Sequence, residues 1–293
     1  MRRVILFLIL LTSIGGCSRT IQPDAVPPVG DITETAPEPL LCSGEESEHR
    51  TTADRRVSFE NVSFSVDSSW VRNVEYFVTP ECVLVVDEIK PDPVGARTLN
   101  FNLRYSASDE EAYISTFPIE DYRNAFARFP HYLENREADL RAIIERPASI
   151  RSYGVEAPPH VRWMDGSPTF YAKAVKRDFA NGSGLFVVTH ISQDAFITIS
   201  NWQLSFLFQG FTRDGKYFVE MHFPVKLKGL ADEPDEFFAR SKKGKGEYGS
   251  SEHLAAYNDY ILRTAARIDK AYGGDFQPSI HQIERFIKGF GVR

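Results

Sequence analysis

The clearest structural pattern in the chain lies in residues 200–224, which read SNWQLSFLFQGFTRDGKYFVEMHFP. Apolar side chains recur at every second position on both sides of Asp214-Gly215, a dipeptide suited to a tight hairpin turn. The recurring residues are Trp202, Leu204, Phe206 and Phe208 before the turn, and Tyr217, Val219, Met221 and Phe223 after it. Because successive side chains of a strand point to opposite faces, we predict a β-hairpin with one apolar face that other elements must cover.

The segments around this hairpin predict further strands and helices. Period-two patterns indicate strands at 57–66, 75–78, 83–89, 99–105, 112–117, 170–179 and 184–191. Helical spacing indicates helices around Tyr122 and Leu140, and two more that begin near Ser250 and Ser279. The alternation of strand and helix groups, with Asn-Gly and Asp-Gly turns, predicts the α+β class: an antiparallel sheet with helices packed on one face.

The composition is that of a globular protein rich in aromatic residues. The 293 residues are 42% hydrophobic, 25% charged and 13% aromatic. The formal net charge of -6 offers no broad electrostatic footprint for nucleic acid. We therefore do not expect nucleic acid among the partners.

Residues 1–16 predict a secretory leader. Arg2 and Arg3 are followed by an apolar core at 4–11 and by small residues, a run too short for a stable membrane span. The sequence Ile14-Gly15-Gly16-Cys17 resembles the lipobox of bacterial lipoproteins, whose cysteine takes a diacylglycerol and whose new amino terminus is often acylated. We predict lipidation at Cys17. The alternative is a plain leader followed by a coincidental cysteine.

The predicted lipid sets the expected location. Several acyl chains hold a protein at a membrane much more firmly than one chain does. By resemblance to the lipoprotein sorting rule, Ser18 argues against retention at the inner membrane, where Asp is the usual signal. We expect a lipid-anchored protein of the cell envelope, on the outer membrane if the cell has two.

Residues 17–56 predict a flexible tether. They contain five prolines and scattered acidic residues with little periodic apolar pattern. Such a segment cannot bury enough apolar surface to offset the entropy lost on ordering. No repeat or boundary follows Val57, so we expect residues 57–293 to form a single domain.

Cys42 in the tether and Cys82 in the folded region are the cysteines that remain besides Cys17. In an exported protein an even pair favours a disulfide, and two free thiols are the alternative. The seven histidines show no metal-ligand spacing, and no phosphate-binding loop or paired-carboxylate pattern appears. We expect no metal and no cofactor.

Several segments together resemble a family of exported bacterial proteins, often lipoproteins. They are Asn181-Gly-Ser-Gly184 before a strand, Gln193-Asp194 after it, Phe208-Gln-Gly-Phe-Thr-Arg-Asp-Gly-Lys-Tyr217, and Phe276-Gln-Pro278 followed by Ile280, Ile283 and Glu284. The resemblance covers most of residues 57–292. Its motifs are turns and core positions, so it implies export and a fold rather than an activity. The chain is more loosely similar to the photosystem-associated PsbP-like α+β fold.

His190 and His222 are the candidate catalytic residues. Both lie in predicted strands that could bring them together with Asp194, and a His–Asp pair can do acid–base work. The alternative is that each histidine is packed or solvated on a sheet face. Gly182-Ser183-Gly184 is not a nucleophile elbow, because a strand follows it where that motif needs a helix.

Two polar loops supply the candidate binding residues, which are Gln193, Asp194, Arg213 and Asp214. These residue types are also typical of turns, because Asp and Thr hydrogen-bond turn backbones. The functional interpretation is that both loops form one rim that binds a partner or a sugar. Three aromatic residues are expected to be exposed beside it: Trp163, Phe170 and Tyr171.

Two functions of different classes fit these features. The first is a lipid-anchored envelope protein that serves as a non-catalytic binding or structural module, with the membrane and an envelope protein as partners. The second is an envelope hydrolase that uses His190 or His222. The lack of a recognisable nucleophile or metal pattern favours the first.

Overall fold

The computed structural model describes residues 49–80, 84–87, 90–92, 96–125, 130–146, 153–154, 159–162, 167–192, 196–235 and 250–293. All of them belong to the compact unit Pro39–Arg293. The predicted leader, the predicted lipidation site Cys17, most of the predicted tether and the cysteines Cys42 and Cys82 lie outside the described residues.

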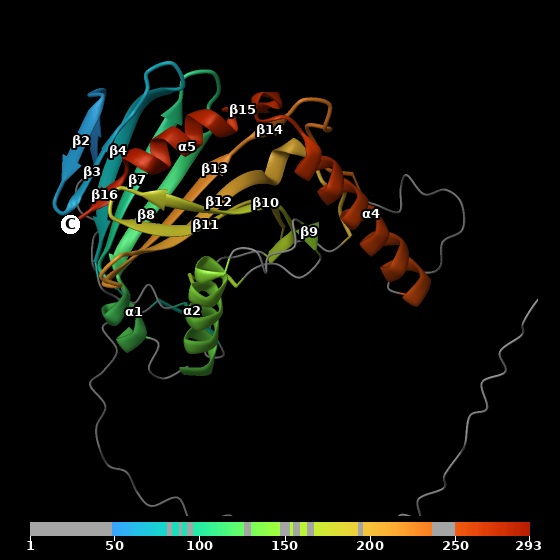
Figure 1. Ribbon diagram of the computed structural model, residues 1–293, viewed down its shortest axis with the longest axis horizontal. Coiled ribbons are helices and arrows are strands. Elements are labelled where there is room, and N and C mark those ends of the chain that lie inside the picture. The colour runs from blue at the N-terminus through green and yellow to red at the C-terminus, as the bar shows by residue number, and fades with distance from the viewer. Residues whose placement is uncertain are drawn as a thin grey trace, which may run out of the picture. The chain divides into compact units, whose positions relative to one another are not determined.

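The domain is built on one large antiparallel sheet, which has nine strands in the described part of the chain (Figure 1). In spatial order they are β1 (Arg50–Thr52), β4 (Val71–Thr79), β7 (Thr98–Tyr105), β8 (Glu111–Pro118), β13 (Tyr217–Pro224), β12 (Leu204–Thr212), β11 (Gly182–Ser192), β10 (Ser167–Phe179) and β9 (Tyr153–Gly154). All eight pairings are antiparallel, as the turn-rich sequence predicted.

Smaller sheets and helices surround this sheet. A three-stranded sheet joins β2 (Arg56–Phe59), β3 (Val62–Ser65) and β16 (Gly291–Val292), and two-stranded sheets join β5 (Leu84–Asp87) to β6 (Lys90–Asp92) and β14 (Lys226–Leu227) to β15 (Phe276–Gln277). The helices are α1 (Ile119–Ala125), α2 (Pro130–Glu145), α4 (Ser251–Lys270) and α5 (Ile280–Gly289), with 3-10 turns η2 (Asn201–Gln203) and η3 (Gly273–Asp275). No helix in the described ranges is both long and apolar enough to cross a membrane.

The predicted helix starts at Ser250 and Ser279 are confirmed. The hydroxyl of Ser250 accepts a hydrogen bond from the backbone N–H of His253, and that of Ser279 accepts one from Gln282. Each hydroxyl satisfies an N–H group that the first helical turn leaves without a partner.

The central hairpin forms as predicted, with Phe206 opposite Phe223 and Phe208 opposite Met221. Trp202 is the exception, because it is 58% exposed rather than part of the apolar face. It lies in η2, where the chain is not yet a strand and the alternation does not apply. The neighbouring Asn201 points inward instead and accepts a hydrogen bond from the backbone N–H of Leu227 at 2.8 Å.

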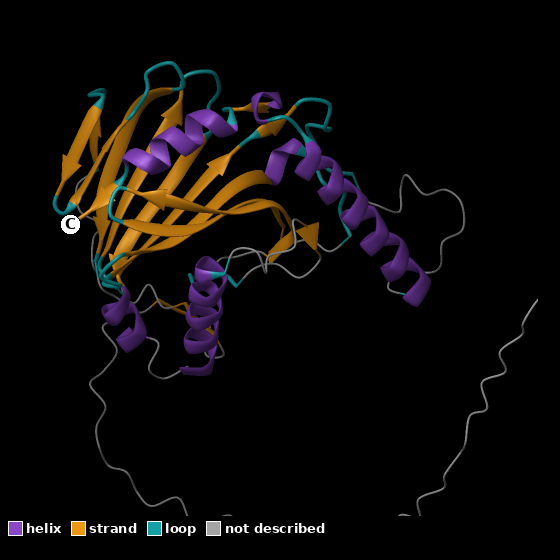
Figure 2. Cartoon of the chain, viewed as in Figure 1, coloured by secondary structure: helices purple, strands orange, loops and turns teal. Residues whose placement is uncertain are grey.

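Helices cover both faces of the large sheet, so the prediction of helices on one face is wrong in this respect, although the antiparallel α+β class is confirmed. α4 and α5 pack on the face that carries Phe206 and Met221. α1 and α2 pack on the opposite face, against Leu207 and Phe218 (Figure 2). The second cover, formed by α1 and α2, was not predicted. The reason is that Gln209, on the same face as Leu207, resembles a residue that faces solvent.

The folded region begins earlier than the sequence pattern indicated. β1 pairs with β4, with Arg50 opposite Tyr76, so residues 50–52 belong to the sheet and not to the predicted tether. β1 is an edge strand of exposed or partly exposed residues, and it therefore lacks the apolar alternation that marks a buried strand.

We predict that Phe206→Ala lowers the free energy of unfolding by about 3–5 kcal/mol, because a large cavity would replace a fully buried ring. Phe206 is 0% exposed, and its ring centroid lies 5.0 Å from that of Phe186 and 5.1 Å from that of Phe276. Chemical denaturation measures the change. Trp202→Ala is the matched control and should cost less than about 1 kcal/mol. Equal effects of the two substitutions would contradict the packing described here.

Candidate functional site

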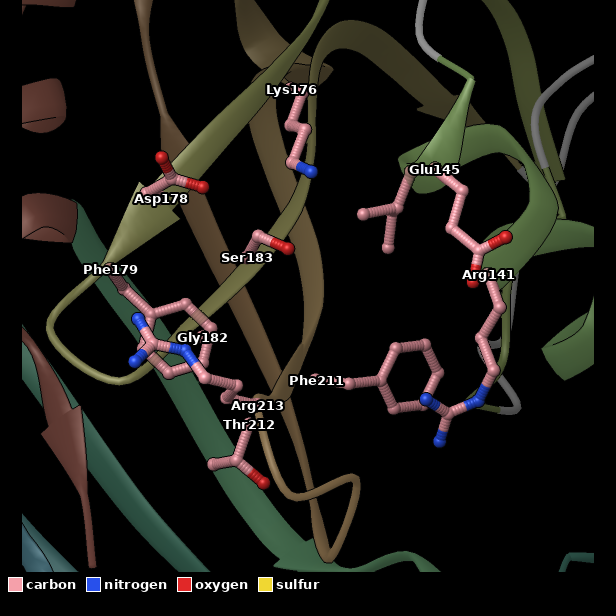
Figure 3. Close-up of a pocket in the computed structure, with 11 residues that line it drawn as sticks. Arg141, Glu145, Lys176, Asp178, Phe179, Gly182, Ser183, Phe211, Thr212 and Arg213 are labelled. Carbon is pink, nitrogen blue, oxygen red and sulfur yellow. The ribbon is translucent and has the colours of Figure 1, made fainter.

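A cleft of about 450 Å³ opens where the ends of two hairpins meet α2 (Figure 3). Its sheet side is formed by β10, β11 and β12, and its helix side by Arg141, Ile144 and Glu145. Across the β10–β11 pair, Asp178 lies opposite Ser183 and Lys176 lies opposite Leu185. Because Leu185 belongs to the core under α2, these polar side chains stand on the sheet face that α2 covers.

Charged contacts hold the helix side of the cleft in place. The Arg141 guanidinium lies 3.7 Å from the centre of the Phe211 ring, and its Nε donates to the Glu137 carboxylate at 2.7 Å. The buried Glu137 also accepts from Arg123 at 2.7 Å. Burial alone would raise the pKa of Glu137, but the hydrogen bonds from Arg123 and Arg141 lower it below its usual value. Arg141 therefore has a fixed position in the wall of the cleft, and its charge is already paired with that of Glu137.

Close backbone packing builds the sheet side. Gly182 pairs with Thr212 across β11 and β12, and a Cβ atom on Gly182 would lie 2.2 Å from the Phe211 carbonyl oxygen. The predicted Asn181-Gly182 hairpin turn is confirmed, and Asn181 O accepts from the backbone N–H of Arg213 at 2.8 Å. Glycine is therefore required here so that the two hairpin ends can approach each other.

The two candidate residues of the β12–β13 turn have different positions. Arg213 is exposed and lines the cleft. Asp214 instead accepts hydrogen bonds from the Thr212 hydroxyl at 2.6 Å and from the backbone N–H of Lys216 at 3.2 Å. These bonds keep the pKa of Asp214 below its usual value. Asp214 orders the turn that presents Arg213.

The expectation that both polar loops share one rim stays a prediction, because the loop of Gln193 and Asp194 lies outside the described residues. These two residues follow directly on Ser192, the last residue of β11. The other end of β11, Gly182, pairs with Thr212 beside the Arg213 turn. Since a strand rises about 3.3 Å per residue, Ser192 lies roughly 30 Å from Gly182, at the opposite end of β11.

Two of the three aromatic residues expected to be exposed are buried or partly buried instead. Phe170 is 0% exposed and belongs to the core under α4 and α5. Tyr171 is partly buried against the core under α2. Trp163 lies outside the described residues.

The two candidate catalytic histidines do not approach each other. His190 alternates with Val188 on β11 and lies on the face of α4 and α5, where it is 0% exposed. His222 pairs with Leu207 and lies on the opposite face. Burial lowers the pKa of each histidine to about 4. Neither ring nitrogen of His190 has a hydrogen-bond partner among the described residues, so the ring packs as a neutral core residue.

A row of polar residues that the sequence did not single out crosses four strands on the face of α2. Gln209 lies opposite Glu220, Glu220 opposite Ser115, and Ser115 opposite Asn100. The short segment 159–162 lies over this row. The Gln209 amide accepts from the backbone N–H of Val161 at 3.0 Å and donates to Pro159 O at 3.2 Å.

Charged groups complete this covered row. The Arg162 guanidinium donates to the hydroxyls of Tyr113 and Ser115, each at 2.8 Å. The Nε2 atom of His160 lies 3.7 Å from a carboxylate oxygen of Glu220, and neither atom has a hydrogen-bond partner in the described ranges. Burial lowers the pKa of His160, despite the nearby Glu220 carboxylate. Among the described residues no group of three or more His, Cys, Asp or Glu side chains could hold a metal ion.

The sequence patterns missed most residues of the cleft. Lys176 and Ser183 could have been placed on one face of the sheet by extending the register outward from the Asn181-Gly182 turn. Arg141 and Glu145 carried no such signal, since their contact with the hairpin ends depends on where α2 packs.

No protein-family model, curated protein or solved structure matches this chain. The resemblance to exported bacterial proteins therefore stays a prediction, and function is argued from the residues themselves.

We predict that His190 makes the domain less stable in acid. Its folded pKa of about 4 lies below the ordinary value of 6.5, so the unfolded chain binds the proton more readily. The contribution of the neutral His190 ring to the free energy of unfolding is fully present above pH 6.5. It is lost as the pH falls toward 4, by about 3 kcal/mol at most.

Unfolding free energies measured at several pH values test this prediction. His190→Leu should reduce the loss of stability between pH 6.5 and 4, because no proton can bind there. His281→Leu is the control, because the His281 side chain is 61% exposed and its replacement changes no buried group. An identical acid profile for His190→Leu and the wild type would show that His190 is not buried as described.

Proposed function

We propose that this chain is a cell-envelope protein, anchored by lipid at Cys17, whose domain is a non-catalytic module that binds a ligand or an envelope partner at the cleft. The leader and the lipobox-like Ile14-Gly15-Gly16-Cys17 support the location, with the outer membrane favoured where the cell has two. The domain then faces the aqueous side of the envelope on the predicted tether.

The proposed binding role is supported by the polar groups that line the cleft. Arg213 from the β12–β13 turn, Lys176 from β10 and Glu145 from α2 meet at one concave surface, although they are far apart in sequence. Concave surfaces with a few convergent polar groups are the usual form of a ligand site. Arg213 is also exposed without an ion-pair partner among the described residues, so its guanidinium is available to a ligand.

The geometry gives less support to the alternative, an envelope hydrolase. His190 is fully buried and therefore cannot contact a substrate. His222 is partly exposed, but its Nε2 atom has no hydrogen-bond partner within the described part of the chain, and a pKa of about 4 makes it a weak base at neutral pH.

Crosslinking in intact envelopes, followed by capture of the anchored protein, tests the proposal. Arg213→Ala should reduce the captured ligand or partner about five- to tenfold, as expected for the loss of a charge-assisted hydrogen bond. Its melting temperature should stay within a degree or two of wild type, because the Arg213 side chain makes no ion pair with any described residue. Cys17→Ser should lose both fatty-acid labelling and capture.

Lys288→Ala is the matched control, because it removes an exposed cation on α5, which packs on the sheet face opposite the cleft. Equal capture by Arg213→Ala and by the wild type would reject the cleft as the binding site. Turnover in a hydrolase screen that His222→Ala abolishes would instead establish the enzyme.

A further inference from the structure

We propose that the ligand of the cleft is zwitterionic, specifically a short peptide whose free carboxylate and free ammonium are both bound. This inference rests on the proposed function, and it adds the chemical class of the ligand. Its basis is that the cleft presents unpaired charges of both signs rather than a patch of one sign.

The unpaired cations lie on the hairpin side. Lys176 and Arg213 have no ion-pair partner in the described part of the chain. Figure 3 shows the Lys176 ammonium and the Ser183 hydroxyl extending into the cleft from neighbouring strands. The Ser183 hydroxyl also has no partner among the described groups. An ammonium and a hydroxyl on adjacent strands are donors suited to one carboxylate.

The unpaired anions are Glu145 on α2 and Asp178 on β10, and both side chains are exposed. Neither carboxylate pairs with a described cation, including Lys176, which is two residues from Asp178 on the same strand. A purely anionic ligand would meet these carboxylates with like charge, which is unfavourable. A ligand that also carries an ammonium would satisfy them.

The other polar groups of the cleft already have partners, so they do not count toward the ligand. Arg141 is bound to Glu137 and stacked on Phe211. The Thr212 hydroxyl donates to Asp214 and accepts from the backbone N–H of Tyr217. What remains available is therefore two cations, two carboxylates and one hydroxyl around buried Ile144 and Phe211.

The size of the cleft favours a small ligand. A volume of about 450 Å³ lies in the range of sites for small molecules rather than of surfaces that dock a folded protein. A peptide of two or three residues supplies both charges and a short backbone. The other common source of the same charge pair is a phosphoethanolamine headgroup.

Nuclear magnetic resonance titrations of the purified full-length protein, followed through the Gly182 and Ser183 amides, test the proposal. The probes are triglycine, N-acetyl-triglycine, which lacks the ammonium, and triglycine amide, which lacks the carboxylate. Triglycine should bind about tenfold more tightly than either analogue, because each analogue forgoes one charge-assisted contact. Phosphoethanolamine is the fourth probe.

Two substitutions identify which group binds which charge. Lys176→Met should weaken triglycine about tenfold and leave triglycine amide unchanged. Glu145→Gln should weaken triglycine and leave N-acetyl-triglycine unchanged. Because each variant is expected to bind one probe normally, a loss caused by misfolding is recognised at once. Lys288→Met, on the helix that packs on the opposite face of the sheet, should bind all probes as the wild type does.

Three results would overturn the inference. They are binding of N-acetyl-triglycine as tight as that of triglycine, binding of phosphoethanolamine without triglycine, and no binding of any probe at millimolar concentration. None of these results changes the outcome of the envelope capture experiment. They would therefore reject a short peptide as the ligand without rejecting the binding role of the cleft. Conversely, triglycine binding without any captured partner would separate a small-molecule site from a partner site.

Discussion

The architecture depends on one constraint: the central strand β12, Leu204–Thr212, is buried along its whole length. An exposed hairpin could leave its polar face to water, but a strand covered on both sides must find protein partners for every polar group. Gln209 meets this need by binding the backbone of residues 159–161 with both ends of its amide. The Gln209 side chain therefore binds the second cover, which is the segment 159–162 together with α1 and α2. It also sets where this cover lies on the sheet.

The cleft follows from how this second cover is attached. Arg136 on α2 donates to His160 O at 3.2 Å, and the Tyr122 hydroxyl donates to Val161 O at 3.4 Å, so both helices of this face are connected to the segment that Gln209 holds. α2 ends at Glu145, beside the tight β10–β11 turn. The space left between the helix end and the hairpin ends is where the unpaired charges gather. The site is thus a consequence of packing on the second face, and the first face, under α4 and α5, supplies stability.

The sequence was informative where the signal is local and failed where distant segments meet. Alternation and Asp214-Gly215 predicted the hairpin, but η2 interrupts the alternation at Trp202, which the pattern alone could not reveal. Gln209 suggested a solvated face because period two does not distinguish water from a polar partner. Arg213 was predicted as a binding residue because it lies in the polar turn at Asp214-Gly215. His190 and His222 were misjudged as a pair because residue type does not report which sheet face a strand presents.

The most direct test of this account is hydrogen exchange at the Val161 amide. If Gln209 holds the second cover, Val161 should be protected in the wild type and should exchange at least about tenfold faster in Gln209→Met, which keeps the volume but removes the acceptor. Amides of the β12–β13 ladder such as Phe206 should keep their protection. Unchanged Val161 exchange in Gln209→Met would contradict the account, because the cover would then be held by something other than the buried strand.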